Sequence, residues 1–163
     1  MDCVKQVLGA ETASFIESGC VLIVGTVGPG NEPHASRGWG VTVLEGEPTR
    51  LRLLLDSHDT IAIEHVAQGG LIALTGGDVA TLRSTQLKGR ASDLEPVTPE
   101  DEARAERYID EMLTIINQID GTPREQIERL RPSGYIACTV TIDEFYDQTP
   151  GPGAGAPIDV SGS

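Results

Sequence analysis

The chain has 163 residues and a formal net charge of −13, from 12 Lys and Arg against 25 Asp and Glu. This length fits one domain with its own core, and the acidic balance argues against nucleic acid or an anionic membrane as the main partner. Cys3, Cys20 and Cys138 form no CxxC pair, so neither a disulfide framework nor a zinc site is expected. Without a signal-peptide pattern or an apolar run of membrane-spanning length, we expect a cytoplasmic protein.

The first half of the chain alternates predicted strands with two helices. Apolar runs bounded by Gly, Pro and Asn predict strands at 20–27, 34–44, 50–56, 71–75 and 79–91. In the strand at 50–56, three leucines alternate with two arginines, which predicts one buried and one polar face. Helices are expected over 11–18 and 59–67, the second with Ser57 or His58 near its N-cap.

The second half contains the longest predicted helix. Thr98, Pro99 and the acidic residues after them form a helix start signal, and Gly121 ends the helix. Its apolar residues predict a core-facing stripe: Ala105, Tyr108, Ile109, Met112, Leu113 and Ile116. A short helix and a strand at 135–145 follow. We therefore expect a domain over 1–147 with a helical insertion at about 98–131, and a flexible Gly/Pro-rich tail over 148–163.

The strand predicted at 34–44 carries the only tryptophan of the chain. Alternation places Arg37 and Trp39 on one face and Gly38 and Gly40 on the other. Glycine inside a strand suits a close approach of ligand to backbone, and arginine can grip an anion through a forked pair of hydrogen bonds. The segment suits a flat, phosphate-bearing cofactor. An edge strand with a bulge and a surface arginine explains it equally well.

The strand predicted at 79–91 is rich in polar groups. Ser84, Thr85, Gln86 and Lys88 offer hydroxyls, an amide and a cation that could bond a heterocyclic ring or a phosphate, although a solvent-facing strand has the same composition. The histidines are not spaced as metal ligands, and nucleophile-elbow, GxGxxG and P-loop motifs are absent. No metal site is expected and the catalytic residues stay unknown. Such a protein takes its chemistry from a cofactor or performs none.

Over roughly residues 15–145, the chain resembles the pyridoxamine 5′-phosphate oxidase-like FMN-binding split barrels. The resemblance rests on the hairpin, the Pro-x-x-Ser-Arg segment ending at Arg37, the leucine strand, the helix, the short strand and the Arg-x-x-x-x-x-Gly segment ending at Gly89. The Gly/Pro tail is similar to that of an uncharacterised bacterial subgroup. The resemblance implies a mainly β split barrel with helices, and a homodimer that binds FMN between its subunits.

The resemblance also implies site residues. Arg37, Gly38, Trp39 and Gly40 would lie along the flavin, with Arg37 at the phosphate and Trp39 beside the ring. Ser57 and Thr60 would approach the phosphate, and Ser84, Thr85 and Gln86 the ring or the ribityl chain. Where many members carry basic residues near the helix start, this chain has Asp59-Thr60-Ile61.

The function implied is that of an FMN-dependent oxidoreductase acting on a small organic substrate. The substrate-binding features of the vitamin B6 oxidases have no counterpart near the C-terminus of this chain. Two alternatives stay open: a non-catalytic flavin- or haem-binding carrier or sensor, and a split barrel that has lost its cofactor.

Overall fold

Strands dominate the computed structural model, which describes residues 8–46 and 48–158. The strands are β1 (Val21–Val27), β2 (Pro33–Arg37), β3 (Val41–Leu44), β4 (Arg50–Asp56), β5 (Leu71–Gly77), β6 (Ser84–Pro96), β7 (Tyr135–Asp147) and β8 (Ala156–Pro157). The helices are α1 (Ala10–Ile16), α2 (Thr60–Ala67), α3 (Pro99–Asp120) and α4 (Arg124–Glu128). The prediction of a mainly β fold with a few helices is confirmed. Cys3 lies outside the described residues.

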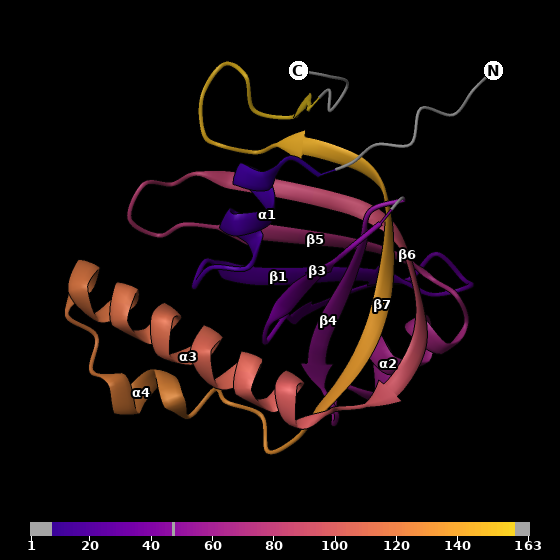
Figure 1. The fold of residues 1–163 in the computed structure, drawn as a ribbon, viewed down its shortest axis with the longest axis horizontal. Helices are drawn as coiled ribbons and strands as arrows, with labels where there is room; N and C mark the ends of the chain where they lie inside the picture. Colours follow the sequence, from indigo (N-terminus) through magenta and orange to yellow (C-terminus); the bar gives the residue numbers. More distant parts are fainter. Residues whose placement is uncertain (1–7, 47, 159–163) are drawn as a thin grey trace.

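All strand pairs are antiparallel, and the order across the sheet is β2-β1-β5-β6-β7-β4-β3, with β8 beside β7. In Figure 1, β4 runs steeply across the direction of β1 and β5, and the long β7 curves between the two groups. This curvature encloses the core, which includes Leu22 and Val24 of β1 and the leucines of β4. The predicted burial of alternate leucines in β4 is confirmed for Leu51, Leu53 and Leu55.

The single strand predicted at 34–44 is in fact two strands, β2 and β3, joined by a corner. Gly38 N donates to Leu22 O of β1 at 3.1 Å, whereas Trp39 N donates to Leu54 O of β4 at 2.9 Å. The chain changes partner strand at this point, and Gly40 has a φ of +144°, which glycine adopts readily. Trp39 consequently turns into the core with 4% of its surface exposed, and does not share an exposed face with Arg37.

The strand predicted at 79–91 begins and ends later than expected. Residues 78–83 form a turn, in which the Asp78 carboxylate accepts hydrogen bonds from Ala80 N and Thr81 N. Strand β6 then runs from Ser84 to Pro96, and its register with β7 shifts between Lys88 and Gly89 and again between Ser92 and Glu95. These irregularities increase the local bend of the strand.

The tail is hydrogen-bonded to the barrel in residues 148–158, and its predicted flexibility stays a prediction. In residues 148–158, Ser84 N donates to Thr149 Oγ1 at 3.1 Å and Ile158 N donates to Phe145 O at 2.9 Å. β8 pairs with the last residues of β7, so backbone hydrogen bonds replace the core contacts that this composition lacks. The tail residues 159–163 lie outside the described residues.

Helix α3 follows its predicted start and end, and its apolar stripe is buried as expected. Thr98 and Asp101 form a reciprocal capping box, and Gly121 ends the helix in a left-handed conformation. Tyr108 Oη accepts from Leu22 N of β1 at 3.2 Å, which ties the middle of the helix to the sheet. Among the helices of the described residues, none is long and apolar enough to cross a membrane.

The start of α3 is bound to β4 through Arg52. Its Nε and Nη2 atoms donate to the two carboxylate oxygens of the buried Asp101 at 2.8 and 2.7 Å, and Nη1 donates to Glu95 at 2.6 Å. The hydrogen bonds from Arg52 lower the pKa of Asp101. A bidentate pair of this kind fixes both distance and orientation.

We predict that Asp101→Asn lowers the free energy of unfolding by about 3 kcal/mol, because it removes the buried, bidentate partner of the Arg52 guanidinium and leaves only the more exposed Glu95. Urea unfolding at pH 7, followed by circular dichroism, measures this difference. Glu95→Gln is the matched control. Glu95 is the more exposed partner of the same arginine, so its loss should change stability by less than about 1 kcal/mol.

The same pair gives an acid dependence. A carboxyl whose folded pKa is lowered stabilises the fold above its ordinary value of 3.8 and loses that effect as the pH falls through the folded pKa. The difference between wild type and Asp101→Asn should therefore shrink below about pH 4. An equal difference at pH 3 and pH 7 would contradict the assignment.

Candidate functional site

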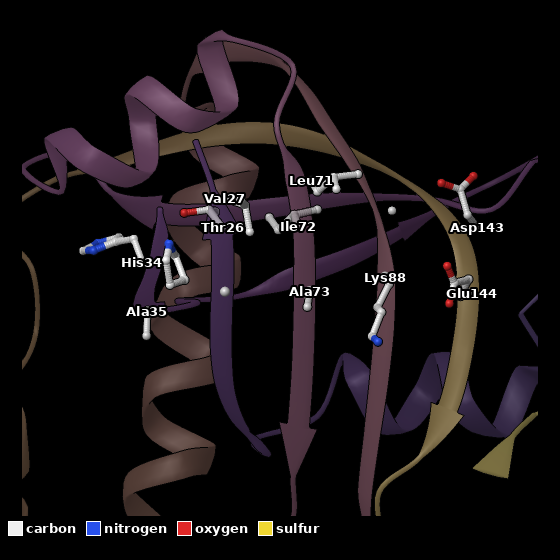
Figure 2. A pocket seen from close by; sticks show the side chains of 13 residues that line it. Thr26, Val27, His34, Ala35, Leu71, Ile72, Ala73, Lys88, Asp143 and Glu144 are labelled. Atoms are coloured by element: carbon white, nitrogen blue, oxygen red, sulfur yellow. The ribbon is translucent and has the colours of Figure 1, made fainter. Parts of the chain in front are cut away.

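A hollow of about 580 Å³ lies on the outer face of the sheet, the face whose side chains point away from the core. Its lining comes from five strands, β2, β1, β5, β6 and β7. Figure 2 shows this face, with Ala73, Lys88 and Glu144 on three neighbouring strands, and with Ala35 on β2, separated from Ala73 by β1. The volume is in the range typical of pockets that bind small molecules.

The floor of the hollow is a row of very small residues. Gly25 pairs in register with Ala35 of β2 on one side and with Ala73 of β5 on the other. A β-carbon added at Gly25 would meet a single atom within 4 Å, Ala73 O at 3.9 Å. We refer to the channel over Ala35, Gly25 and Ala73 as the trough.

Larger side chains flank the trough on both sides. Two residues away along each strand, about 7 Å, lie Pro33, Val27 and Leu71 on the side of α2. Arg37, Ile23 and Thr75 lie on the other side. The trough is thus a flat, apolar channel between two ridges, and Arg37 on one ridge is exposed.

The β7 end of the trough carries charges. Lys88 pairs in register with Ala73 and Glu144, while Asp143 is the extra residue of the bulge between Glu144 and Ile142. Lys88 Nζ lies 4.6 Å from the centroid of the Tyr146 ring, and Tyr146 Oη donates to Glu144. This hydrogen bond raises the pKa of Tyr146. The bulge therefore places two adjacent carboxylates, Asp143 and Glu144, beside the cation of Lys88.

The α2 side of the hollow has a separate set of polar contacts. His34 Nε2 lies 2.9 and 3.0 Å from the two carboxylate oxygens of Asp59, and His65 Nδ1 lies 2.9 Å from Thr26 Oγ1. The two imidazoles make an edge-to-face contact at 6.4 Å. In Figure 2 the His34 ring points away from Ala35 and Ala73, so this histidine borders the trough without entering it.

The structure separates the predicted site residues into three groups. Arg37, Ser84, Gln86 and Lys88 alternate with buried neighbours and lie on the outer face, with Lys88 in the lining of the hollow. Gln86 is held by Thr75 Oγ1 at 3.0 Å. Four others are buried behind that face: Gly38, Trp39, Gly40 and Thr85. Ser57, in the turn after β4, and Thr60, the first residue of α2, lie in neither the trough nor its ridges.

The N-cap of α2 is Asp59 and not Ser57 or His58. Asp59 Oδ1 accepts from Ala62 N at 3.1 Å and the same carboxylate is bound to His34. The carboxylate thus occupies the place that a bound anion would take at this helix N-terminus. Aspartate is one of the residues preferred at a helix N-cap, so Asp59 could have been identified as the cap from the sequence.

Sequence reasoning missed the floor of the trough and its acidic end. Ala35, Gly25 and Ala73 come from three strands and become neighbours only through the register in which those strands pair.

Burial raises the pKa of the Cys20 thiol to about 11 and that of Cys138 to about 12, which fits their expected role as core residues. Residues 8–46 and 48–158 hold no group of three His, Cys, Asp or Glu side chains arranged for a metal ion.

Comparisons with known proteins find likeness in structure alone. No family model and no curated protein matches the sequence. HupZ from Group A Streptococcus superposes with a TM-score of 0.54 at 12% identity, over 91% of this chain and 100% of that one. A Lactobacillus delbrueckii protein assigned as a pyridoxamine 5′-phosphate oxidase gives 0.54 at 15%, over 88% and 95%. An F420 reductase gives 0.53 at 17%, over 81% and 93%.

These matches cover nearly the whole of each chain. The protein therefore has the fold of the pyridoxamine 5′-phosphate oxidase-like split barrels, a mainly antiparallel β fold with helices, as the sequence resemblance predicted. At identities of 12 to 17% the likeness concerns the fold.

We predict that Gly25→Val folds normally, with a change of less than about 1 kcal/mol in the free energy of unfolding, because its β-carbon enters open space. Gly89→Ala is the contrasting variant. A β-carbon there would collide with the carbonyl oxygen of Thr141, so a loss of about 3 kcal/mol or more is expected. Thermal melting and urea unfolding of both variants test the description of the trough floor. A well-folded Gly89→Ala protein would contradict it.

Proposed function

We propose that this protein binds a flavin, FMN, in the trough and acts as a homodimeric oxidoreductase on a small organic substrate. The observation that carries the proposal is the row of Ala35, Gly25 and Ala73 at the floor of a hollow of about 580 Å³. The fold supports it, since similar structures include proteins named as a pyridoxamine 5′-phosphate oxidase and an F420 reductase.

The trough fits the ring system of a flavin. Three adjacent strands spaced about 5 Å apart give a floor about 10 Å across, and the small residues on it leave room for a planar ring to lie against the backbone. The ridge residues Val27 and Ile23 provide apolar contact on either side. Lys88 in the lining of the hollow and Gln86 two residues before it on β6 would offer polar groups to the ring edge.

The charges around the trough indicate the direction of the phosphate. Asp143 and Glu144 at the β7 end would repel it, and Asp59 already caps α2. Arg37 is exposed at the opposite, β2 side and forms no ion pair with any described residue. A guanidinium without a partner is a good ligand for a phosphate group. The phosphate therefore points toward Arg37.

A bound flavin supplies the transfer of two electrons between a donor and an acceptor. The chain itself would position the substrate. Lys88 can donate hydrogen bonds to a substrate oxygen at the β7 end, and the ridges exclude water from the ring. Haem has less support, because His34 Nε2 and His65 Nδ1 are already hydrogen-bonded to Asp59 and to Thr26 Oγ1.

We predict that the purified protein retains FMN through gel filtration, with two visible flavin bands. Filling the floor with Gly25→Phe should abolish retention while the protein stays folded, because the ring and the new side chain compete for one space. Arg37→Ala should weaken FMN binding more than about tenfold. Fluorescence titration with FMN measures both effects.

Arg50→Ala is the matched control, since Arg50 is an exposed arginine of β4, outside the trough. A colourless protein that does not bind added FMN would contradict the flavin assignment. Retention without turnover, when NADH or NADPH and an electron acceptor are supplied, would favour the carrier or sensor over the enzyme.

The outer face also favours a second copy of the chain as partner. Ile23, Leu71 and Leu82 are 42%, 51% and 59% exposed, and Ile23 and Leu71 flank the trough. Such a concentration of apolar surface is typical of a protein interface. A second subunit would cover these residues and close the trough over its ligand.

We predict a dimer in light scattering after gel filtration, and a shift to monomer in Ile23→Glu, because a carboxylate buried in an apolar interface is strongly unfavourable. Ile119→Glu is the control, since Ile119 is 51% exposed but lies at the end of α3. A monomeric wild-type protein would contradict the proposal.

A further inference from the structure

The strand that forms one wall of the trough is an edge strand. β2 pairs with β1 and, among the described strands, with no other. Its outward residues Pro33 and Ala35 line the hollow. An edge strand held on one side is free to move away unless another contact secures it.

That contact is the hydrogen bond between His34 and Asp59, which we name the β2–α2 bridge. His34 lies on the opposite face of β2 from Ala35, and its Nε2 is within 3.0 Å of both oxygens of Asp59. Asp59 is itself fixed as the N-cap of α2 through Ala62 N. The bridge therefore joins β2, at one end of the sheet order, to the turn after β4, near the other end.

The contacts at the two ends of β2 determine how the strand would move if the bridge were broken. At its C-terminal end the corner of Gly38, Trp39 and Gly40 is bonded to β1 and β4, so the strand would turn about this corner if released. At its N-terminal end the bridge is close to Thr26 and His65, which tie β1 to the same helix. β1 is paired with β2 on one side and with β5 on the other, so the sheet already holds it without the Thr26–His65 bond. β2 has a partner on one side only, so the bridge matters more for β2.

We propose that His34 and Asp59 are positioning residues for the trough: their bridge holds β2 in place as its wall and so sets the affinity for the ligand. This inference rests on the proposed ligand site in the trough. The titratable groups that contact His34 are Asp59, the N-cap of α2, and His65 of α2. Hydrogen bonds to a carboxylate are stronger than those between neutral groups. The bridge therefore adds to the ladder with β1 in holding β2 as the wall of the trough.

Hydrogen exchange tests the bridge without any ligand. In His34→Leu, amides of residues 33–37 should exchange about tenfold faster than in wild type. His34→Gln keeps a side-chain N–H at a similar reach and should restore slow exchange. His58→Gln, at an exposed histidine of the neighbouring turn, should leave exchange of 33–37 unchanged. Equal exchange in wild type and His34→Leu overturns the bridge.

Titration with FMN tests the positioning role. His34→Leu should bind FMN about tenfold more weakly than wild type, and His34→Gln should recover most of the affinity because its side-chain N–H can still reach Asp59.

The two proposals fail in different ways. Faster exchange of 33–37 in His34→Leu, in a protein that binds no FMN, supports the bridge and overturns flavin binding. FMN binding that is equal in wild type and His34→Leu overturns the positioning role and leaves flavin binding intact.

Discussion

The architecture depends on a constraint of chain connectivity. β2 and β3 stand at opposite ends of the strand order, yet three residues separate them in the sequence. An open sheet cannot satisfy this, because its two ends would be several strand widths apart. The sheet must therefore curl until its ends meet at Gly38, Trp39 and Gly40, where the backbone hydrogen bonds change from β1, at Gly38, to β4, at Trp39 and Gly40. The core, the burial of Trp39 and the strong curvature of β7 all follow from this closure.

Closure also decides which surface is left for a ligand. The inner face of the sheet is filled by core side chains, and α3 is bound to β1, β3 and β4 through Tyr108, Arg104 and Arg52. α2 lies against β1 and β2 through its two histidine contacts. The outer face of β2, β1, β5, β6 and β7 stays uncovered by any described helix, with exposed aliphatic side chains around a floor of small ones. The proposed ligand and the proposed partner therefore share one surface.

Local signals predicted most of the elements, and long-range pairing produced the errors. Alternating leucines identified β4, and the capping box with Gly121 set both ends of α3. The break at Gly38 was missed because alternation within one segment does not tell which strand each half pairs with. The trough was missed for a related reason: residues 25, 35 and 73 become neighbours only through the register of three strands. Arg37 and Lys88 could be selected by type, since an exposed cation on a strand is visible in sequence, whereas the burial of Trp39 depended on the corner.

The short β8 bears on the self-association of the protein. β7 is paired with β4 over Tyr135–Thr141, and beyond that point β8 covers Tyr146 and Asp147 on the same edge. A strand edge with free amides and carbonyls is a template for intermolecular pairing and aggregation. Pro157, in β8 itself, has no amide to donate and so is a poor surface for a further strand. The Gly/Pro-rich segment thus covers the end of this strand edge, which its composition suits better than a contribution to the core.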